Sequence, residues 1–281
     1  MTHNLPTTIS KTAVRTALLE SLQGEILALR ASDRWAAYLD AQSRFHNYSP
    51  RNVMLISMQR PDATHVAGFH TWRQLNRTIT KGERALSILA PLFSQSIEHD
   101  HDTPIGFRWV SVFDIAQTQG PSLPSPVQLL SARVPAHLEP ALSSVVQQIG
   151  FTLLYEQLPT GVNGECRWAD REIVIQADNP ALQRVKTIVH ECAHALLHQH
   201  ERSRALAEIE AESVAYIALK SWGLDAAPYS AGYVASWLDQ GDDLHAVIER
   251  SLSAIQRASA TILRGFEQQD LPSKRASSFA F

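Results

Sequence analysis

Two histidines four residues apart, inside a long apolar segment, constrain this 281-residue chain more than any other feature. His190 and His194 belong to the pentapeptide His-Glu-Cys-Ala-His, with VKTIV before it and ALLH after it. Apolar flanks at this spacing predict a buried helix, and residues four apart lie on one face of a helix. Both imidazoles can then reach a single ion, so the segment predicts a core helix that carries a metal site.

Glu191 follows the first histidine and is expected beside such an ion, where its carboxylate can hold a water and accept its proton. Neutral imidazoles suit Zn²⁺, and a catalytic zinc keeps an open position for a water, whose pKa it lowers to about 7. The motif alone is weak, because it arises by chance in amphipathic helices, but its apolar setting strengthens it. We therefore predict zinc ligands at His190 and His194 and a general base at Glu191.

A second apolar segment, AEIEAESVAYIAL, carries three carboxylates, at Glu208, Glu210 and Glu212. Burying carboxylates is costly unless something positive receives them, and a metal ion is the simplest recipient. Helix geometry places Glu208 and Glu212 on one face and Glu210 about 200° away. In zinc proteases of the gluzincin type, a ligand glutamate is commonly followed four residues later by an acid that orients a histidine. That resemblance favours Glu208 as the third ligand with Glu212 behind it, and Glu210 and Glu212 stay as alternatives for the ligand.

Other residues near the motif give weaker signals. His198 is expected to line the rim of the site or to end its helix. Tyr216, Tyr229 and Tyr233 can each donate to a developing oxyanion, or pack as core aromatics. The segment REIVIQ (171–176) is expected to be an edge strand onto which an extended peptide can add.

Charge is unevenly distributed along the chain. The formal net charge is −3, yet residues 41–90 hold seven Lys or Arg and only two acidic residues. A basic region inside an acidic protein suits an anionic partner, while ordinary solvated charge is the alternative.

A polar segment at 117–126 with three Pro and one Gly is the predicted linker, and it divides the chain into two predicted domains, 1–120 and 127–281. The expected class is α+β: a mixed α/β N-terminal domain followed by a mainly helical domain with a small sheet. Helices are predicted at 12–45, 52–59, 69–75, 139–149, 205–221 and 243–268, and from Asn179 (N-cap) and Pro180 through the histidine motif. Strands are predicted at 85–91, 107–115, 151–156 and 171–176.

Composition and the N-terminal sequence indicate where the protein is located. No stretch approaches the about 20 apolar residues that span a bilayer, so no membrane span is expected. The N-terminus has no apolar core behind a basic start, so no secretory signal is expected. Two cysteines, Cys166 and Cys192, form at most one disulfide, and Cys192 is expected to be a small buried hydrophobe. Together these features predict a cytoplasmic protein.

Two family resemblances follow from these motifs. TIVHECAHALLH and EIEAESVAY resemble the ImmA/IrrE-type metallopeptidases over about 165–222. The N-terminal half resembles the N-terminal domain of ArdC-type antirestriction proteins over about 45–118, and the two parts occur in this order in ArdC-like proteins. The residues that carry the second resemblance are YSPRN (48–52), MQRP (58–61), VAGFHTWRQLNR (66–77), KGERALSILAP (81–91) and VFDIAQT (112–118).

The resemblance implies an N-terminal domain that binds single-stranded DNA and a C-terminal zincin-like (gluzincin) metallopeptidase that holds Zn²⁺ and cleaves a protein or peptide. ArdC-type proteins come from conjugative plasmids, where they protect incoming DNA from restriction. Basic side chains would then meet phosphates and aromatic ones would stack on bases. The residues expected to contact DNA are Arg44, Tyr48, Arg51, Asn52, Phe69, Trp72, Arg73, Arg77, Lys81 and Arg84.

Two departures from these families and several alternatives remain at this level. Cys192 stands where Leu or Gly is common within the motif, and EIEAESVAY replaces the more usual ArdC EELVAE. Trp72 can be core instead of a stacking platform, and Asn52 and Gln59 can satisfy backbone groups instead of bases. The favoured function is a DNA-directed zinc protease that acts in antirestriction or on DNA-bound proteins. The alternatives are a DNA-occupying protein with a structural zinc, and a protease that cleaves one cognate repressor.

Overall fold

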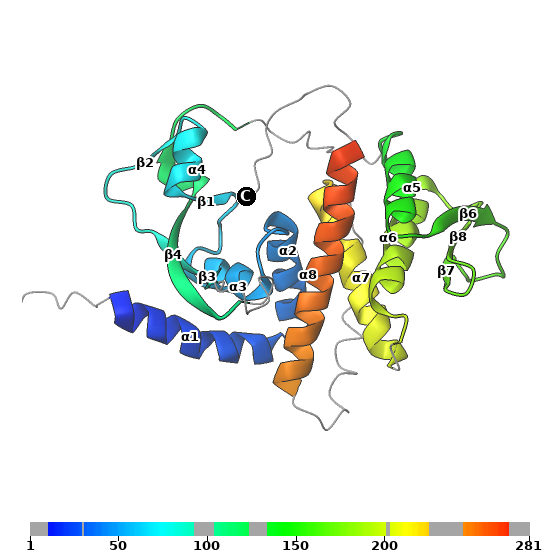
Figure 1. Cartoon of the computed structure of the whole chain (residues 1–281), viewed down its shortest axis with the longest axis horizontal. Helices are drawn as coiled ribbons and strands as arrows, with labels where there is room; N and C mark the ends of the chain where they lie inside the picture. Colours follow the sequence, from blue (N-terminus) through cyan, green and yellow to red (C-terminus); the bar gives the residue numbers. More distant parts are fainter. Residues whose placement is uncertain are drawn as a thin grey trace, which may run out of the picture. The chain divides into compact units, whose positions relative to one another are not determined.

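The structure is a computed structural model that describes residues 11–29, 31–92, 104–123, 134–200, 203–224 and 244–269 (Figure 1). The chain divides into two compact units. Unit 1 consists of Met1–Ala28 and Arg51–Pro121, and unit 2 of Leu29–Pro50 and Ser122–Phe281. The division at Pro121 falls inside the proline-rich segment at 117–126. Within the described residues, no helix is long and apolar enough to cross a membrane.

Unit 1 is built on a three-stranded antiparallel sheet of order β1-β4-β3. The described residues of this unit also form three helices, a 3-10 turn and a two-stranded ladder of β2 with β5. In chain order they are α1 (Lys11–Ala28), α3 (Pro50–Gln59), β1 (Val66–Gly68), α4 (Phe69–Gln74), β2 (Thr78–Ile79), β3 (Leu86–Leu92), β4 (Gly106–Asp114), η1 (Ile115–Gln117) and β5 (Thr118–Gln119).

The β3–β4 hairpin pairs Leu86 with Val112 and continues to Leu92 with Gly106. Alternating burial along β3 sends Leu86 and Ile88 into the core of unit 1, where Leu55 and Trp72 are fully buried. Helix α3 lies along β3, and its polar side chains bind the strand's backbone. Asn52 exchanges two hydrogen bonds with the backbone of Leu89, and Gln59 does the same with Ser87.

Unit 2 is layered, with a small sheet on one side and packed helices on the other. Strand β8 is central in the order β6-β8-β7, parallel to β6 and antiparallel to β7. Helices α5 and α6 lie between this sheet and α7 and α8 (Figure 1). The elements are α2 (Ser32–Arg44), α5 (Leu138–Gln148), β6 (Thr152–Glu156), β7 (Gly164–Arg167), β8 (Glu172–Gln176), α6 (Ala181–Leu197), α7 (Arg204–Ser221) and α8 (Leu244–Gln269).

Two sequence predictions about unit 2 were wrong in detail. REIVIQ forms the central strand β8, so it is not an edge; the edges of the described sheet are β6 and β7, and strand β7 was not predicted. The N-cap of α6 is Pro180, one residue later than expected. The Asn179 amide bonds Asn163 instead, and its carbonyl accepts from Arg184.

The predicted helix at 12–45 is two helices in two units. Ala31 has extended backbone (φ −80°, ψ 134°), which ends the helical conformation before α2. Helix α2 packs on α7, where the Trp35 indole donates to Ser213 and the Tyr216 hydroxyl donates to Asp40. Leu29–Pro50 therefore belongs to unit 2, although the sequence placed it in a domain spanning 1–120. The other predicted helices and strands are confirmed within a few residues.

Candidate functional site

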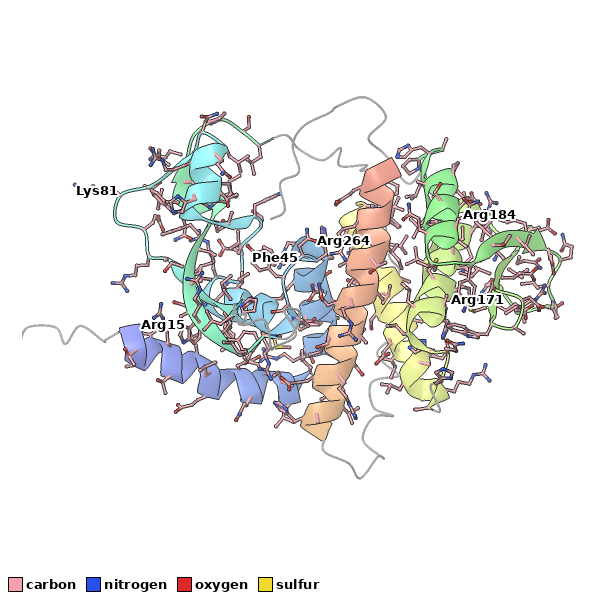
Figure 2. All side chains as sticks on the ribbon, viewed as in Figure 1. Arg15, Phe45, Lys81, Arg171, Arg184 and Arg264 are labelled. Carbon is pink, nitrogen blue, oxygen red and sulfur yellow. The ribbon has the colours of Figure 1, made fainter. Side chains whose placement is uncertain are left out.

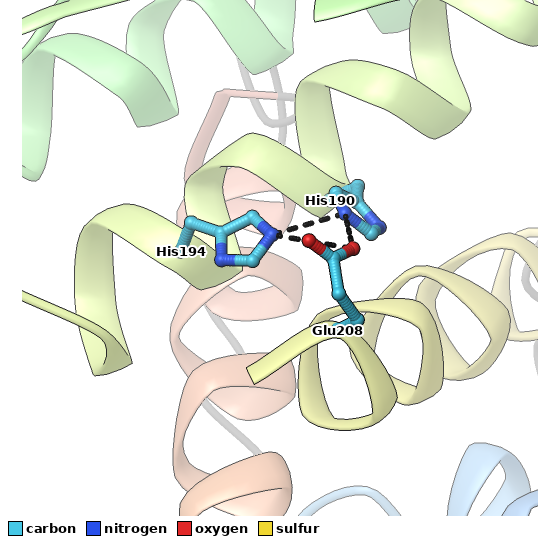
Figure 3. A group of neighbouring side chains, drawn as sticks. All are labelled: His190, His194 and Glu208. Atoms are coloured by element: carbon cyan, nitrogen blue, oxygen red, sulfur yellow. Dashed lines mark hydrogen bonds and ion pairs between the residues drawn. The ribbon is translucent and has the colours of Figure 1, made fainter. Parts of the chain in front are cut away.

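The two motif histidines and one glutamate converge between α6 and α7 (Figure 3). His190 Nε2 and His194 Nε2 lie 3.1 Å apart, and Glu208 Oε2 lies 3.3 Å from the first and 3.9 Å from the second. One ligand atom from each of these three residues lies within 4.8 Å of the others. Two imidazole nitrogens and a carboxylate oxygen form a donor set that divalent transition metals accept, so the residues present fit such an ion.

Local structure explains why these three meet. His190 and His194 are one turn apart on α6, whose apolar face is buried through Val185, Ile188 and Val189. Helix α7 begins just beyond Ser203, whose hydroxyl accepts from the Leu206 backbone as an N-cap. Glu208 therefore lies in the second turn of a packed helix, and its position is fixed by the α6–α7 contact.

Glu212, expected behind the ligands, does contact a histidine. Its Oε2 lies 3.5 Å from His190 Nδ1, the ring nitrogen on the far side from Glu208, and its Oε1 lies 2.6 Å from Lys186 Nζ. Burial opposes ionisation of Glu212, but His190 and Lys186 bring its pKa below the usual value. A charged carboxylate at this position fixes the orientation of the His190 ring.

Glu210 does not join the cluster of ligand atoms. Its Oε2 lies 3.0 Å from His198 Nε2, and His198 Nδ1 lies 2.9 Å from His194 Nδ1. Helix geometry predicted that Glu210 points away from the site, but it fixes only the direction of Cβ. The C-cap of α6, His198, lies within reach of the Glu210 carboxylate and links it to His194. His198 both ends α6 and lines the site, so the two roles weighed for it are combined.

Glu191 has the electrostatics of a base that works near neutrality. Burial raises the pKa of its carboxyl to about 7, against the attraction of His190. Burial lowers the pKa of His190, but the carboxylates of Glu208 and Glu212 outweigh it and raise that pKa to about 9. The pKa of His194 falls to about 4, first through burial and then through His190 and His198.

A cavity of about 290 Å³ opens beside the cluster. Sequence reasoning missed four of its residues: Cys166 on β7, Trp168 just after that strand, and Arg204 and Ala207 in the first turn of α7. Cys166 and Trp168 are distant from the motif in sequence, and only the pairing of β7 with β8 brings them to α6. The cavity is lined by Cys166, Trp168, Glu191, His194, His198, Arg204, Ala207 and Glu208.

The tyrosines weighed as oxyanion donors are not among these residues. The Tyr216 hydroxyl donates to Asp40 of α2 at 2.8 Å, which makes it a packing contact. Tyr229 and Tyr233 lie outside the described residues. Cys192 is fully buried and Cys166 is half-buried, and both are free thiols.

Three residues expected to contact DNA are instead committed to the core of unit 1. Trp72 is fully buried and donates to the Phe113 carbonyl, and Asn52 is bonded to the Leu89 backbone. Arg77 is buried, and its guanidinium donates to Thr118 and to the carbonyls of Gly120 and Pro121. Residue type and spacing alone do not show which aromatic or basic side chain points inward.

The remaining candidates are divided between the units. Arg44 and Tyr48 belong to unit 2, where Arg44 stacks on Phe45 and burial raises the pKa of Tyr48 to about 12. Unit 1 keeps an exposed set, of which Lys81 projects outward from the turn before β3 (Figure 2). On α4, the Arg73 guanidinium lies 6.0 Å from the exposed Phe69 ring. The exposed set is Arg51, Phe69, Arg73, Lys81 and Arg84.

Comparisons with known proteins agree with this architecture. The family model described as the N-terminal domain of anti-restriction factor ArdC matches residues 19–117. An uncharacterized protein of Bacillus anthracis is 23% identical over 276 residues, covering 81% of this chain and 46% of its own length. The chain thus spans about half the length of that relative.

Two crystal structures of the antirestriction protein ArdC from the R388 plasmid have a similar fold, both 18% identical in sequence. The Mn(II)-bound structure matches with a TM-score of 0.50 over 78% of this chain and 85% of that one. The metal-free structure matches with a TM-score of 0.49 over 79% and 86%.

The fold and the site define a two-unit α+β protein with a His-Glu-x-x-His helix in its second unit. Residues 19–117 match the family of ArdC N-terminal domains, and the fold of the chain is similar to that of the Mn(II)-bound R388 ArdC structure.

Proposed function

We propose that unit 2 is a metal-dependent peptidase of the zincin-like, gluzincin type, and that unit 1 directs it to single-stranded DNA. The observation that carries the proposal is the convergence of His190, His194 and Glu208 within 4.8 Å, next to a buried Glu191. This is the arrangement expected of a hydrolytic metal site with one carboxylate left free as a base.

The chain's own groups would divide the reaction between them. A divalent cation, when bound, would polarise the peptide carbonyl and acidify water. Glu191 takes the proton from the attacking water as the C–O bond forms, and returns it to the amide nitrogen as the C–N bond breaks. Its pKa of about 7 suits both transfers. In this proposal the peptide would lie in the cavity lined by Trp168 and Arg204.

The proposed metal is supported by a related crystal structure. The R388 ArdC protein has been crystallised with Mn(II), which supports metal binding by this chain as well. Two imidazoles and one carboxylate are a known catalytic zinc set, and we propose Zn²⁺ as the cofactor, with Mn²⁺ as the ion to compare.

The DNA-binding role of unit 1 rests on its likeness to the ArdC N-terminal domain and on its exposed side chains. Phe69 is 47% exposed with Arg73 beside it, and an aromatic ring next to a cation suits the stacked bases and phosphates of a single strand. We propose that protein cleavage near such DNA serves antirestriction or the processing of DNA-bound proteins.

The deciding experiment compares wild type with Glu191→Gln, and with Glu20→Gln as an exposed control. We expect Glu191→Gln to keep metal and single-stranded DNA binding and to lose cleavage of a peptide library, while Glu20→Gln cleaves as wild type does. Metal-loaded wild type that cleaves no peptide or protein, with or without single-stranded DNA, would contradict the peptidase. An antirestriction effect that survives Glu191→Gln would show that the DNA-occupying role suffices.

A further inference from the structure

His198 and Glu210 form a buried polar pair that the reaction described above does not use. Their side chains are 5% and 9% exposed, and His198 Nε2 lies 3.0 Å from Glu210 Oε2. A buried carboxylate needs a donor, and His198 supplies it. The same imidazole extends the other way, with its Nδ1 2.9 Å from Nδ1 of His194.

The three groups have one consistent arrangement of protons. His194 presents Nε2 to His190 and Glu208, so a metal ion would take the lone pair of that nitrogen, and the ring proton must then lie on Nδ1. The His194 Nδ1–H can donate only if His198 Nδ1 carries a lone pair. The proton of neutral His198 therefore lies on Nε2, where Glu210 accepts it.

We propose that His198 and Glu210 are positioning residues that hold His194 in the tautomer and orientation that metal binding requires. This inference rests on the proposed metal site. It adds to that site a second carboxylate that orients a ligating histidine. Glu212 contacts the Nδ1 of His190 directly, whereas the carboxylate of Glu210 acts on His194 through an intervening imidazole. A carboxylate behind each ligating histidine fixes the ring and raises its basicity.

The positions of these residues explain why an imidazole is needed between Glu210 and His194. His198 is the C-cap of α6, and its backbone N–H still donates to the His194 carbonyl, which fixes its distance from His194. Glu210 is one residue from the buried Ile209 and Ala211 on α7, and it faces the end of α6 rather than the cluster. The imidazole of His198 spans the distance between Glu210 and the His194 ring.

The test measures Zn²⁺ dissociation constants of the full chain by competition with a chromophoric chelator, for His198→Phe, Glu210→Gln and the double variant. We expect His198→Phe to weaken binding by about 10- to 100-fold, as loss of such a partner typically does. Glu210→Gln should weaken it less, because an amide oxygen still accepts from His198. The double variant should match His198→Phe alone, since Glu210 acts only through His198.

A structural role alone predicts a different pattern. The conservative His198→Gln, whose amide oxygen accepts and whose amide nitrogen donates, should recover most of the lost affinity; packing alone predicts no such recovery. The visible absorption of Co²⁺-loaded protein should change in His198→Phe and return in His198→Gln. The exposed His200 gives a matched control, and His200→Phe should bind Zn²⁺ as wild type does.

The outcomes separate this inference from the function on which it rests. The His190→Ala variant should bind no metal. If wild type also binds no metal, the peptidase proposal itself is overturned. Wild type that binds Zn²⁺ while His198→Phe and Glu210→Gln fold and bind it equally well would overturn only the positioning role. If His198→Phe does not fold, the test uses His198→Gln, Glu210→Gln and the variant that combines them. Losses of Zn²⁺ affinity that simply add in the combined variant would also overturn the positioning role.

Discussion

The guanidinium of Arg77 donates to both the hydroxyl and the carbonyl of Thr118, which joins the segment between α4 and β2 to β5. Gly120 beside it has no room for a side chain: a Cβ there would lie 2.7 Å from the Asn76 carbonyl and 2.9 Å from Arg77 Cα. A basic residue in a basic region is here a structural link and not a phosphate contact.

Arg77→Met should therefore lower the free energy of unfolding without any direct effect on DNA contacts. The carbonyls of Thr118 and Gly120 lose a charged donor, and leaving buried acceptors unpaired costs about 1–3 kcal/mol. Urea denaturation of the full chain measures the loss, with the exposed Arg84→Met as control. A stable Arg77→Met that loses DNA affinity would return this residue to the DNA-contacting set.

On the proposed DNA-binding role, Phe69→Ala and Arg73→Glu should weaken single-stranded DNA binding while the protein stays folded. Loss of one stacked base costs about 1–3 kcal/mol, and loss of one phosphate contact reduces the salt slope by about 0.7. Fluorescence anisotropy with an oligonucleotide at several salt concentrations measures both quantities. Arg264→Glu, an exposed change in unit 2, is the control (Figure 2). A loss in Arg264→Glu equal to that in Arg73→Glu would indicate a nonspecific charge effect in place of a phosphate contact at Arg73.

Metal uptake should release a proton at pH 7.5. The pKa of His190 in the metal-free fold is about 9, above its ordinary 6.5, so the ring is protonated at this pH and must lose its proton to become a ligand. By the same linkage, protonated His190 stabilises the metal-free fold below pH 6.5, and this contribution disappears as the pH rises through 9. Calorimetry in buffers of different ionisation enthalpy counts the protons. Uptake without proton release would show that His190 is neutral in the metal-free protein.

Gly164→Ala should loosen the contact between β7 and α6. A Cβ at Gly164 would lie 2.5 Å from Thr187 Cγ2, so strand or helix must move, and such overpacking costs about 1–3 kcal/mol. Because Cys166 follows on the same strand and lines the cavity, peptide cleavage should fall as well. Thermal unfolding and peptide turnover measure the two effects. Gly106→Ala, with nothing within 4 Å of its Cβ, should change neither.

The sequence predicted what depends on spacing within one helix. His190 and His194 share a face because they are four residues apart, and the apolar flanks required burial. Glu208 was preferred because Glu208 with Glu212 four residues later resembles the gluzincin pattern of a ligand and a supporting acid. The cavity walls at Cys166 and Trp168 could not be predicted, since they come from a short strand whose pairing depends on long-range contacts.

Burial patterns also left the identity of packing partners open. The helix predicted at 12–45 did not show which element Trp35 would meet, and the structure shows that its indole donates to Ser213 of α7, in the same unit. Likewise FHTWRQLNR contains two aromatics three residues apart. The structure buries Trp72 and exposes Phe69, because the Trp72 indole finds a carbonyl partner on β4.

The amides of Asn52 and Gln59 have a consequence for how unit 1 meets other chains. The outward-facing backbone groups of Ser87 and Leu89 would offer a free template to another strand, and both are already bonded to α3. An edge covered in this way resists the strand-to-strand association that leads to aggregates. Two side chains that resemble base readers in the sequence thus protect the solubility of the fold.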